Sequence, residues 1–243
     1  KTIGVYIPTM GRVGNQPTAN SLYELSNYVP KLVCPFSEVS DHDRLGYVAV
    51  GCDKRGIGKV RQWIIESAKE DIVVMIDDDH RWSERITPDK PKLRSSEDLD
   101  PLFSLIRRCV DQGFIHGGVG PRQGNQNLDC SSKTGRNGFI EGGHLFKDCD
   151  RVNNFHYLDR EAVLKTGHRF DCLPVMEDFH FTLSLITEGY PNRVIHSYVW
   201  DQKGSNSAGG CSSYRTAQVQ EEGAEGLKRA FPKLVRVVEK SSK

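Results

Sequence analysis

Long apolar runs, paired cysteines and an excess of charge of either sign are all missing from this sequence. No apolar stretch approaches the roughly 18–20 residues that a membrane-spanning helix needs, so we expect no membrane partner. The seven scattered cysteines never form a CxxC pair, which argues against a zinc ribbon or thioredoxin-type motif and is typical of free thiols in a reducing cytoplasm. Lysine and arginine total 33 against 32 aspartates and glutamates, so binding nucleic acid would require a local basic patch.

The composition is that of a folded globular chain. Apolar residues make up 37% and charged residues 27% of the 243 residues, which is enough to bury one sizeable core and argues against wholesale disorder. Runs rich in β-branched residues alternate along the chain with segments whose apolar residues recur at helical spacing. We therefore predict a single α/β domain with a largely parallel sheet.

The boundaries of these elements follow from proline, glycine and capping residues. We predict strands at 3–8, 31–36, 46–51, 72–76, 155–158 and 193–200. We predict helices at 18–29, 56–70, 101–112, 160–166 and 177–188, and a last helix from Pro232 that turns Leu234, Val237 and Val238 inward. Residues 177–188 also alternate like a strand, so both assignments stay open for them.

Three consecutive aspartates directly follow the most apolar strand, residues 72–76. Ligands of open α/β sheets gather beyond the carboxyl ends of strands, and adjacent carboxylates repel one another unless a cation neutralises them. In an extended segment, Asp77 and Asp79 point to the same side and Asp78 to the other. Carboxylate oxygens suit Mg²⁺ or Mn²⁺, which often complete their shell with diphosphate oxygens. We therefore predict a metal site here; the alternative is a helix cap or a solvated turn.

Five segments of the chain, in this order, resemble those of the GT-A glycosyltransferases. They are IPTMGR at 7–12, GIGKVR at 56–61, VMIDDD at 74–79, FHYLDREAVLKTG at 155–167 and MEDFHF at 176–181. The resemblance implies a Rossmann-like, mostly parallel sheet flanked by helices in a single domain. It also implies a nucleotide-sugar and metal-binding half at 1–112, an acceptor-binding half at 113–203 and a C-terminal lid loop and helix at 204–243.

Within that superfamily, the chain is most similar to the phage TET/J-binding-protein-associated glycosyltransferases, which glycosylate 5-hydroxymethylcytosine in DNA. The segments that carry this narrower resemblance are WDQKG at 200–204 and GGCSSYRT at 209–216. Backbone N–H groups of a loop rich in glycine and serine can form an anion-binding nest. Residues 205–215 would therefore close over the departing diphosphate, although a plain linker would also be rich in glycine.

The resemblance assigns roles residue by residue. It implies nucleotide-sugar contacts by Pro8, Thr9, Arg12, Lys59, Arg61, Asp77, Asp78, Lys203, Ser205 and Arg215, metal ligation by Asp77, Asp79 and His196, and catalysis by Asp178 with Glu177. In inverting members, a carboxylate at the position of Asp178 takes the proton of the acceptor hydroxyl during in-line attack. Because Asp78 adds a third acid to the usual Asp-x-Asp pattern, the metal-binding register has two possibilities, one residue apart.

Each of these roles has a plainer alternative. Lys59 and Arg61 could belong to a solvated helix face. Glu177 and Asp178 could simply occupy a helix N-terminus, where negative charge is favoured. A lone histidine such as His196 is more often structural than a ligand.

The resemblance implies that a hexose, glucose from UDP-glucose, is transferred with Mn²⁺ or Mg²⁺ to the hydroxyl of 5-hydroxymethylcytosine in DNA. The expected location is the cytoplasm of a phage-infected bacterial cell. Three other classes stay open: a GT-A enzyme with a non-DNA acceptor, a sugar nucleotidyltransferase, for which 8–12 has too few glycines, and a non-catalytic nucleotide- or DNA-binding module. A DNA acceptor would need a basic surface, for which the candidates are Lys90, Lys92, Arg94, Arg107, Arg108, Lys133, Arg136, Lys228, Arg229, Lys233 and Arg236.

Overall fold

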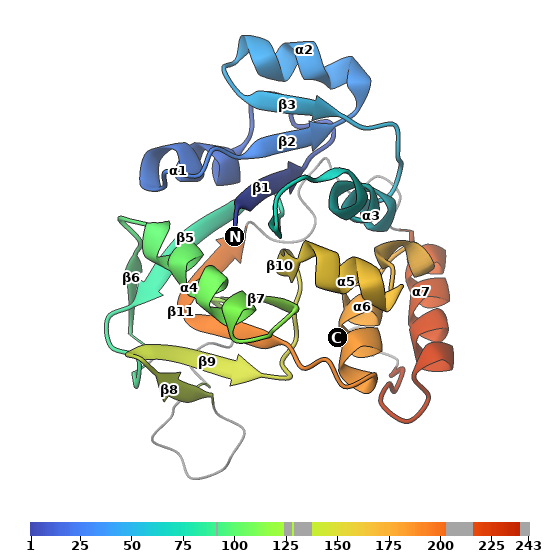
Figure 1. Cartoon of the computed structure of the whole chain (residues 1–243). Helices are drawn as coiled ribbons and strands as arrows, with labels where there is room; N and C mark the ends of the chain where they lie inside the picture. The colour runs from blue at the N-terminus through green and yellow to red at the C-terminus, as the bar shows by residue number, and fades with distance from the viewer. Residues whose placement is uncertain (91, 124–127, 129–137, 203–215, 239–243) are drawn as a thin grey trace, which may run out of the picture.

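The computed structural model describes residues 1–243 except 91, 124–127, 129–137, 203–215 and 239–243 (Figure 1). The described strands are β1 (Ile3–Pro8), β2 (Lys31–Cys34), β3 (Val48–Gly51), β4 (Ile72–Ile76), β5 (His80–Arg85), β6 (Leu93–Ser95), β7 (His116–Pro121), β8 (Phe139–Glu141), β9 (His144–Asp148), β10 (Phe155–Asp159) and β11 (Arg193–Gln202). The described helices are α1 (Pro17–Leu25), α2 (Phe36–Arg44), α3 (Ile57–Ser67), α4 (Asp100–Asp111), α5 (Arg160–Thr166), α6 (Glu177–Thr187) and α7 (Ala217–Ala230), with a short 3₁₀ turn at Phe170–Cys172.

One mixed sheet runs through the molecule in the order β3-β2-β1-β4-β10-β7-β11-β5-β6, and the β8–β9 hairpin joins it through β9 and β11. Strands β3, β2, β1 and β4 pair in parallel. Beyond them, β10 is antiparallel to both β4 and β7, β7 is parallel to β11, and β5 returns antiparallel to β11. The α/β prediction is thus confirmed, with the parallel pairs concentrated in the first 76 residues.

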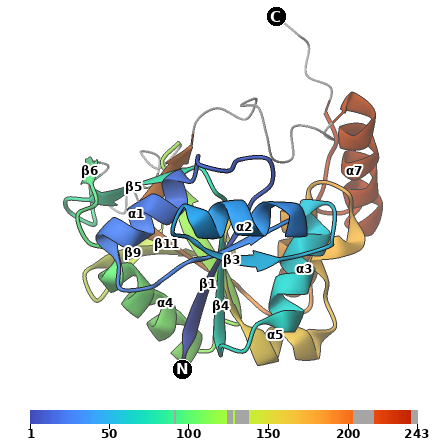
Figure 2. The same ribbon diagram turned by 90° about the horizontal axis from the view of Figure 1, so that it is seen from above.

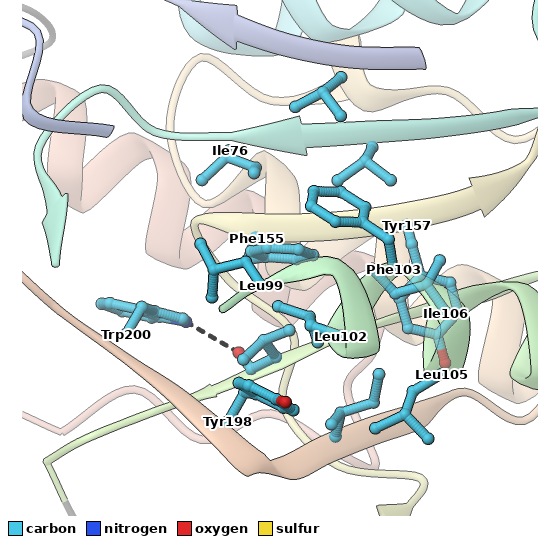
Figure 3. Close-up of a cluster of buried hydrophobic side chains, with 14 of the residues drawn as sticks. Ile76, Leu99, Leu102, Phe103, Leu105, Ile106, Phe155, Tyr157, Tyr198 and Trp200 are labelled. Carbon is cyan, nitrogen blue, oxygen red and sulfur yellow. Dashed lines mark hydrogen bonds between the residues drawn. The ribbon is translucent and has the colours of Figure 1, made fainter. Parts of the chain in front are cut away.

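Helices cover both faces of the parallel strands, with α1 and α4 on one side and α3 and α5 on the other (Figure 2). Val74 on β4 packs in the cluster that includes Leu22 of α1, whereas Val73 packs in the cluster that includes Ile64 of α3. A strand covered on both faces is apolar at every position, as the sequence of β4 is. On the α4 side, the cluster extends to Trp200 of β11, whose indole N–H donates to the Val119 carbonyl at 2.8 Å (Figure 3).

Strand β7 was not predicted, because its sequence HGGVGP reads as a glycine-rich loop. Its glycines are required by close packing between two neighbouring strands. A Cβ on Gly117 would lie 2.2 Å from both the Tyr157 hydroxyl and the Arg193 carbonyl, and one on Gly118 would lie 2.6 Å from the Phe155 carbonyl. Neighbouring backbone therefore leaves no room for a side chain at either position.

The helix predicted from Pro232 is wrong. The last described helix, α7, ends at Ala230, and the side chains of Leu234 and Val238 are 60% and 65% exposed. The α7 helix packs through a glycine, since a Cβ on Gly223 would lie 2.5 Å from the Val175 side chain.

The segment at 177–188 is the helix α6, which decides between the two assignments that the sequence left open.

None of the described helices is long and apolar enough to cross a membrane. The five cysteines in the described residues, Cys34, Cys52, Cys109, Cys149 and Cys172, are all free thiols.

Candidate active site

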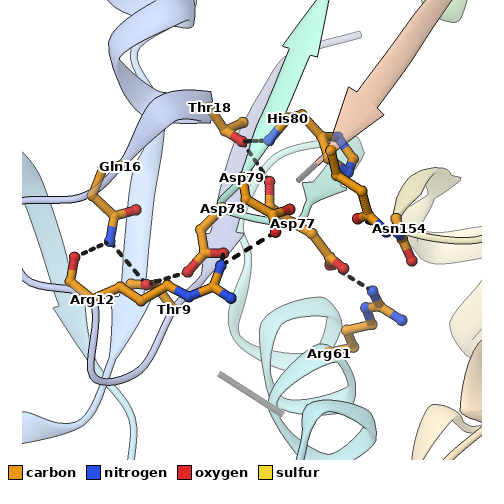
Figure 4. A network of polar contacts seen from close by, with 11 residues as sticks. Thr9, Arg12, Gln16, Thr18, Arg61, Asp77, Asp78, Asp79, His80 and Asn154 are labelled. Carbon is orange, nitrogen blue, oxygen red and sulfur yellow. Dashed lines mark hydrogen bonds and ion pairs between the residues drawn. The ribbon is translucent and has the colours of Figure 1, made fainter. Parts of the chain in front are cut away.

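The three aspartates lie where β1 and β4 end, and their side chains take different directions (Figure 4). The chain turns at Asp78 and Asp79 before β5 begins, so the assumption of an extended segment is wrong. Asp77 accepts a hydrogen bond from Arg61 Nη2 at 2.8 Å. Asp78 instead accepts from the Thr9 hydroxyl at 2.6 Å and forms an ion pair with Arg12, whose Nη1 is also 3.4 Å from Asp79.

The loop after β1 supports this turn. Pro8 and Thr9 are buried, and Gln16 Nε2 donates to the Thr9 hydroxyl at 2.9 Å and to the Arg12 carbonyl at 3.1 Å. Gly11 has a φ of 68°, a conformation that glycine adopts without steric cost. These contacts hold Thr9 and Arg12 beside the aspartates, where the resemblance implies nucleotide contacts.

The start of α1 fixes the backbone of the aspartate turn. The Thr18 hydroxyl donates to the Asp77 carbonyl at 2.6 Å and accepts from the His80 N–H at 2.8 Å. The Thr18 N–H donates to the Asp78 carbonyl at 3.2 Å. These bonds satisfy backbone polar groups of the turn, and the carboxylates of Asp77 and Asp79 instead face Arg61 and Arg12.

The turn carries more negative charge than its neighbours neutralise. Burial raises the pKa of Asp78 to about 6, although Thr9 and Arg12 oppose this shift. The pKa of Asp79 is also raised, by burial and by the charge of Asp77. Crowded carboxylates of this kind favour a bound cation.

Asp77 and Asp79 are the two acids of the turn that fit a divalent cation. Their side chains are 30% and 22% exposed, whereas that of Asp78 is 9% exposed and hydrogen-bonded. No group of three or more histidine, cysteine, aspartate or glutamate side chains with the geometry of a metal site occurs among the described residues. Mg²⁺ is commonly held by one or two carboxylates together with substrate phosphates, and Asp77 and Asp79 fit that arrangement.

His196 contacts Asp150 rather than the aspartate turn. Gln202 pairs with His80 across β11 and β5, whereas His196 lies earlier on β11, where the register with β7 shifts between Ile195 and Val199. Its Nε2 is 3.1 Å from Asp150 Oδ2, and burial lowers its pKa despite that contact. Among the described residues, no hydrogen bond or ion pair joins His196 to the aspartates, and its predicted role as a metal ligand stays a prediction.

Arg61 is a buried bridge between the two halves of the site. It is 2% exposed, and its Nη1 lies 2.6 Å from Glu177 Oε1 while its Nη2 contacts Asp77. The helix that carries Arg61, α3, packs closely against the 3₁₀ turn at Phe170–Cys172, because a Cβ on Gly58 would lie 2.6 Å from the Phe170 carbonyl. The structure thus directs Arg61 to protein carboxylates rather than to an open nucleotide surface.

Lys59, the other cation predicted on this helix, is exposed. Hydrogen bonds from Arg169 lower the pKa of Asp171, and the charge of Lys59 adds to this effect. Lys59 is thus close enough to the short 3₁₀ turn for its charge to act on Asp171. Its predicted nucleotide contact stays a prediction.

Glu177 and Asp178 open α6 and differ in their surroundings. Met176 before them has a left-handed backbone with a φ of 62°. Glu177 is buried against Arg61, and burial raises its pKa to about 7. Burial also raises the pKa of Asp178, but this residue keeps some exposed surface and accepts one hydrogen bond, from the Phe179 N–H at 2.9 Å. Asp178 is therefore the acid of the pair that is free to receive a proton from a substrate.

The end of β11 reaches the aspartate turn through Asn154. Its Nδ2 donates to Gln202 Oε1 at 2.9 Å, and its carbonyl accepts the Asp77 N–H at 2.9 Å. Neither residue is predicted from the sequence, nor are Gln16 and Thr18, because no motif marks them and only the topology brings them together. Lys203, Ser205 and Arg215, predicted to contact the diphosphate, lie outside the described residues.

The basic residues suggested for DNA binding are only partly described. Arg94 forms an ion pair with Glu84, and Arg108 forms one with Glu141. Lys133 and Arg136 lie outside the described residues. A basic DNA-binding surface made by these residues stays a prediction.

Two solved structures illustrate the likeness of this architecture to known folds. One is glucosyl-3-phosphoglycerate synthase from Mycobacterium tuberculosis in complex with Mg²⁺ and UDP, with a TM-score of 0.54, 12% identity, and coverage of 96% of this chain and 80% of that chain. Another is Staphylococcus aureus TarS, residues 1–349, in complex with UDP, with a TM-score of 0.51, 14% identity, and coverage of 95% and 67%. At these identities the likeness shows the fold, which is of the GT-A class.

The family model of the TET-associated glycosyltransferases matches residues 3–210. The chain belongs to this family and is a glycosyltransferase, which confirms the resemblance derived from the sequence. A similar protein is the beta-glucosyl-HMC-alpha-glucosyl-transferase of phage T2, 23% identical over 230 residues that cover 87% of this chain and 75% of the relative. The protein of the same name from phage T6 is 23% identical over 249 residues, which cover 95% and 81%.

Proposed function

We propose that the protein transfers glucose from UDP-glucose to a hydroxyl carried by a 5-hydroxymethylcytosine base in DNA, with Mn²⁺ or Mg²⁺ at the aspartate turn. The observation that carries this proposal is the juxtaposition made by Arg61. It links Asp77, at the end of the strand that would hold the metal, to Glu177, next to the carboxyl group of Asp178. The proposed donor site and the residue next to the proposed proton acceptor would thereby share one ion-paired arginine.

Thr9 and Arg12 would contact the nucleotide beside the metal site. Arg12 already forms ion pairs with Asp78 and Asp79, and its guanidinium would move to bind the negative charge of an incoming diphosphate. Asp77 and Asp79 would hold the cation, and a divalent ion bound there would neutralise the leaving diphosphate, an effect worth several kcal/mol. Solved neighbours with Mg²⁺ and UDP or with UDP support the choice of ligands.

The acceptor hydroxyl has two possible positions. The names of the phage T2 and T6 relatives describe transfer to a base that already carries a β-glucosyl group. The acceptor here could therefore be the hydroxymethyl group of the base or a hydroxyl of glucose attached to it. In either case Asp178 would accept the proton of the attacking hydroxyl, and the reaction would take place in the cytoplasm of a phage-infected cell.

The anomeric configuration of the product tests the role of Asp178. The sugar of UDP-glucose is α-linked, so a β product requires inversion and a base positioned for in-line attack. An α product, as the relatives' names describe for those proteins, requires retention. A β-linked product would therefore support Asp178 as the sole proton acceptor. An α-linked product would contradict that role, because in a retaining reaction the leaving diphosphate and the acceptor would share the proton.

A mass-spectrometric transfer assay with Mn²⁺ tests the proposal. It offers a panel of UDP-sugars to DNA that contains cytosine, 5-hydroxymethylcytosine or β-glucosyl-5-hydroxymethylcytosine, and it identifies the nucleosides after digestion. We expect one hexose added to one or both modified bases and none to cytosine. Metal-dependent release of UDP without modification of DNA would point to an acceptor other than DNA. If no donor is turned over, the binding-module alternative would replace our proposal.

A further inference from the structure

Arg151 is an exposed cation beside the proposed catalytic carboxylate. It lies in the loop between β9 and β10, and its guanidinium carbon is 4.8 Å from the ring centroid of Phe179 on α6. Phe179 directly follows Asp178, and the charge of Arg151 acts on Asp178 against the effect of burial. No carboxylate in the described part of the chain forms an ion pair with Arg151, so its hydrogen-bond donors are available to a ligand.

The loop that carries Arg151 is anchored at both ends. At its start, the Asp150 N–H donates to Asn192 Oδ1 at 3.0 Å, and Asn192 Nδ2 donates back to the Asp150 carbonyl at 2.9 Å. At its end, the Asn154 carbonyl accepts the N–H of Asp77. Cys149 and Asn154 have φ angles of 52° and 61°, which are uncommon without glycine and are concentrated at functional sites. The loop therefore presents Arg151 from a fixed backbone.

The surrounding charges explain why a cation is needed at this place. A DNA acceptor brings one phosphate per 3.4 Å of each strand, and it must approach Asp178, Glu177 and Asp77, which are all acids. Arg61, buried between two of them, cannot reach a ligand outside. An exposed guanidinium stacked on an aromatic ring can bind phosphate through two parallel hydrogen bonds while the ring limits its motion.

We propose that Arg151, held against Phe179, binds a backbone phosphate of the acceptor DNA next to the modified base. This inference rests on the proposed function and adds an acceptor-binding residue to it. The same chemistry would suit the diphosphate of the donor. The position of Arg151, in the β9–β10 loop and packed against Phe179 of α6 rather than on the β1 loop with Thr9 and Arg12, favours the acceptor.

The test compares Arg151→Ala with the wild type and with Arg44→Ala, a control that removes an arginine whose side chain is 75% exposed on α2. Steady-state kinetics give KM for modified DNA, KM for UDP-glucose, and the rate with the modified base as a free nucleoside. We expect Arg151→Ala to raise KM for DNA about tenfold. The plot of log affinity against log salt concentration should also become less steep, by the amount that corresponds to the loss of about one phosphate contact. KM for UDP-glucose and the rate with the nucleoside stay at the wild-type values.

Two further variants separate binding from packing. Arg151→Lys keeps the charge but not the paired hydrogen bonds, so it should restore the salt slope and only part of the affinity. Phe179→Leu should raise KM for DNA by a smaller factor, because the guanidinium loses its aromatic support. Thermal unfolding of each variant, expected to match that of Arg44→Ala, shows that the kinetic effects do not arise from loss of the fold.

The outcomes distinguish this inference from the function on which it rests. A rise in KM for UDP-glucose with unchanged KM for DNA would overturn the inference in favour of a contact with the donor. An active wild type and an equally active Arg151→Ala would overturn it in favour of packing alone. A wild-type protein that neither binds nor modifies hydroxymethylated DNA would refute the proposed function, and the inference with it.

Discussion

Asp77, Asp78 and Asp79 have the same side chain and three different surroundings. Asp77 is bonded to Arg61, Asp78 is buried against Thr9 and Arg12, and Asp79 is half-buried with one longer contact to Arg12. A carboxylate that already has short partners loses them if it binds a metal, whereas one with a longer contact loses less. Asp79 is therefore the acid of the three whose oxygens are least committed to the protein.

Replacing Asp79 by alanine should abolish metal-dependent binding of UDP. The fold should tolerate the change, because within the described residues the Asp79 side chain makes only the 3.4 Å contact with Arg12. Titration calorimetry with UDP, with and without Mn²⁺, measures the effect, and Asp41→Ala, which removes an aspartate of α2 whose side chain is 45% exposed, is the matched control. An Asp79→Ala protein with wild-type affinity for UDP in Mn²⁺ would remove Asp79 from the metal site.

Replacing Asp178 by asparagine should leave UDP binding intact and slow transfer by a factor of about 10²–10⁴, the usual contribution of a general base. The amide has the shape of the carboxylate and can still accept the Phe179 N–H, but it cannot take up a proton. Single-turnover transfer to modified DNA measures the rate. Near-normal turnover by Asp178→Asn would exclude this residue as the base.

At the scale of elements, Arg61 joins three of them: it belongs to α3, and its partners lie after β4 and at the start of α6. The buried carboxylate of Glu177 and the partly exposed carboxylate of Asp77 depend on it, and burial already raises the pKa of Glu177 to about 7. Without the guanidinium, Glu177 would have to stay protonated or be buried as an uncompensated charge, which is costly. The relative position of α6 and the aspartate turn is thus tied to a single side chain.

Arg61→Met should therefore lower the free energy of unfolding by about 3–5 kcal/mol, the usual cost of removing one partner from a buried ion pair. The control is Arg169→Met, which removes an exposed arginine paired with Glu66 and Asp171 and should cost at most about 1 kcal/mol. Urea unfolding of both variants measures the difference. Equal losses in the two proteins would show that the Arg61 bridge contributes no more than a surface ion pair.

At the scale of the whole molecule, a buried histidine pair lies in the middle of the sheet. His116 on β7 and His156 on β10 stack with their rings 5.5 Å apart, and His116 Nε2 is 3.2 Å from His156 Nδ1. Burial lowers the pKa of His116 to about 3 and that of His156 well below its ordinary value. Both rings are thus neutral in the folded protein at pH values where they take up protons in the unfolded chain.

This pair should make the fold sensitive to acid. Because the folded pKa is lowered, the stability that depends on neutral His116 is fully present above about pH 6.5 and is lost as the pH falls toward about 3. His116→Gln, which does not titrate, should remove up to about 1.4 kcal/mol per pH unit from the pH dependence of unfolding in that range. Chemical unfolding of both proteins between pH 7 and pH 4.5 measures the slopes. If the free energies of unfolding of the two proteins change in parallel with pH, His116 has the same pKa in the folded and the unfolded chain.

The sequence by itself determined the α/β class, most of the strands and helices up to residue 200, the family and the aspartate turn. These features depend on local pattern: apolar runs, helical spacing, and motifs whose residues are adjacent in the chain. Only the tertiary structure decided that Gly117 and Gly118 belong to a central strand, because their role is to admit neighbouring backbone. It also decided that Arg61 faces Glu177, that His196 faces Asp150 and that Arg151 lies beside Asp178. Such contacts depend on how distant segments pack, and no spacing along one chain contains that information.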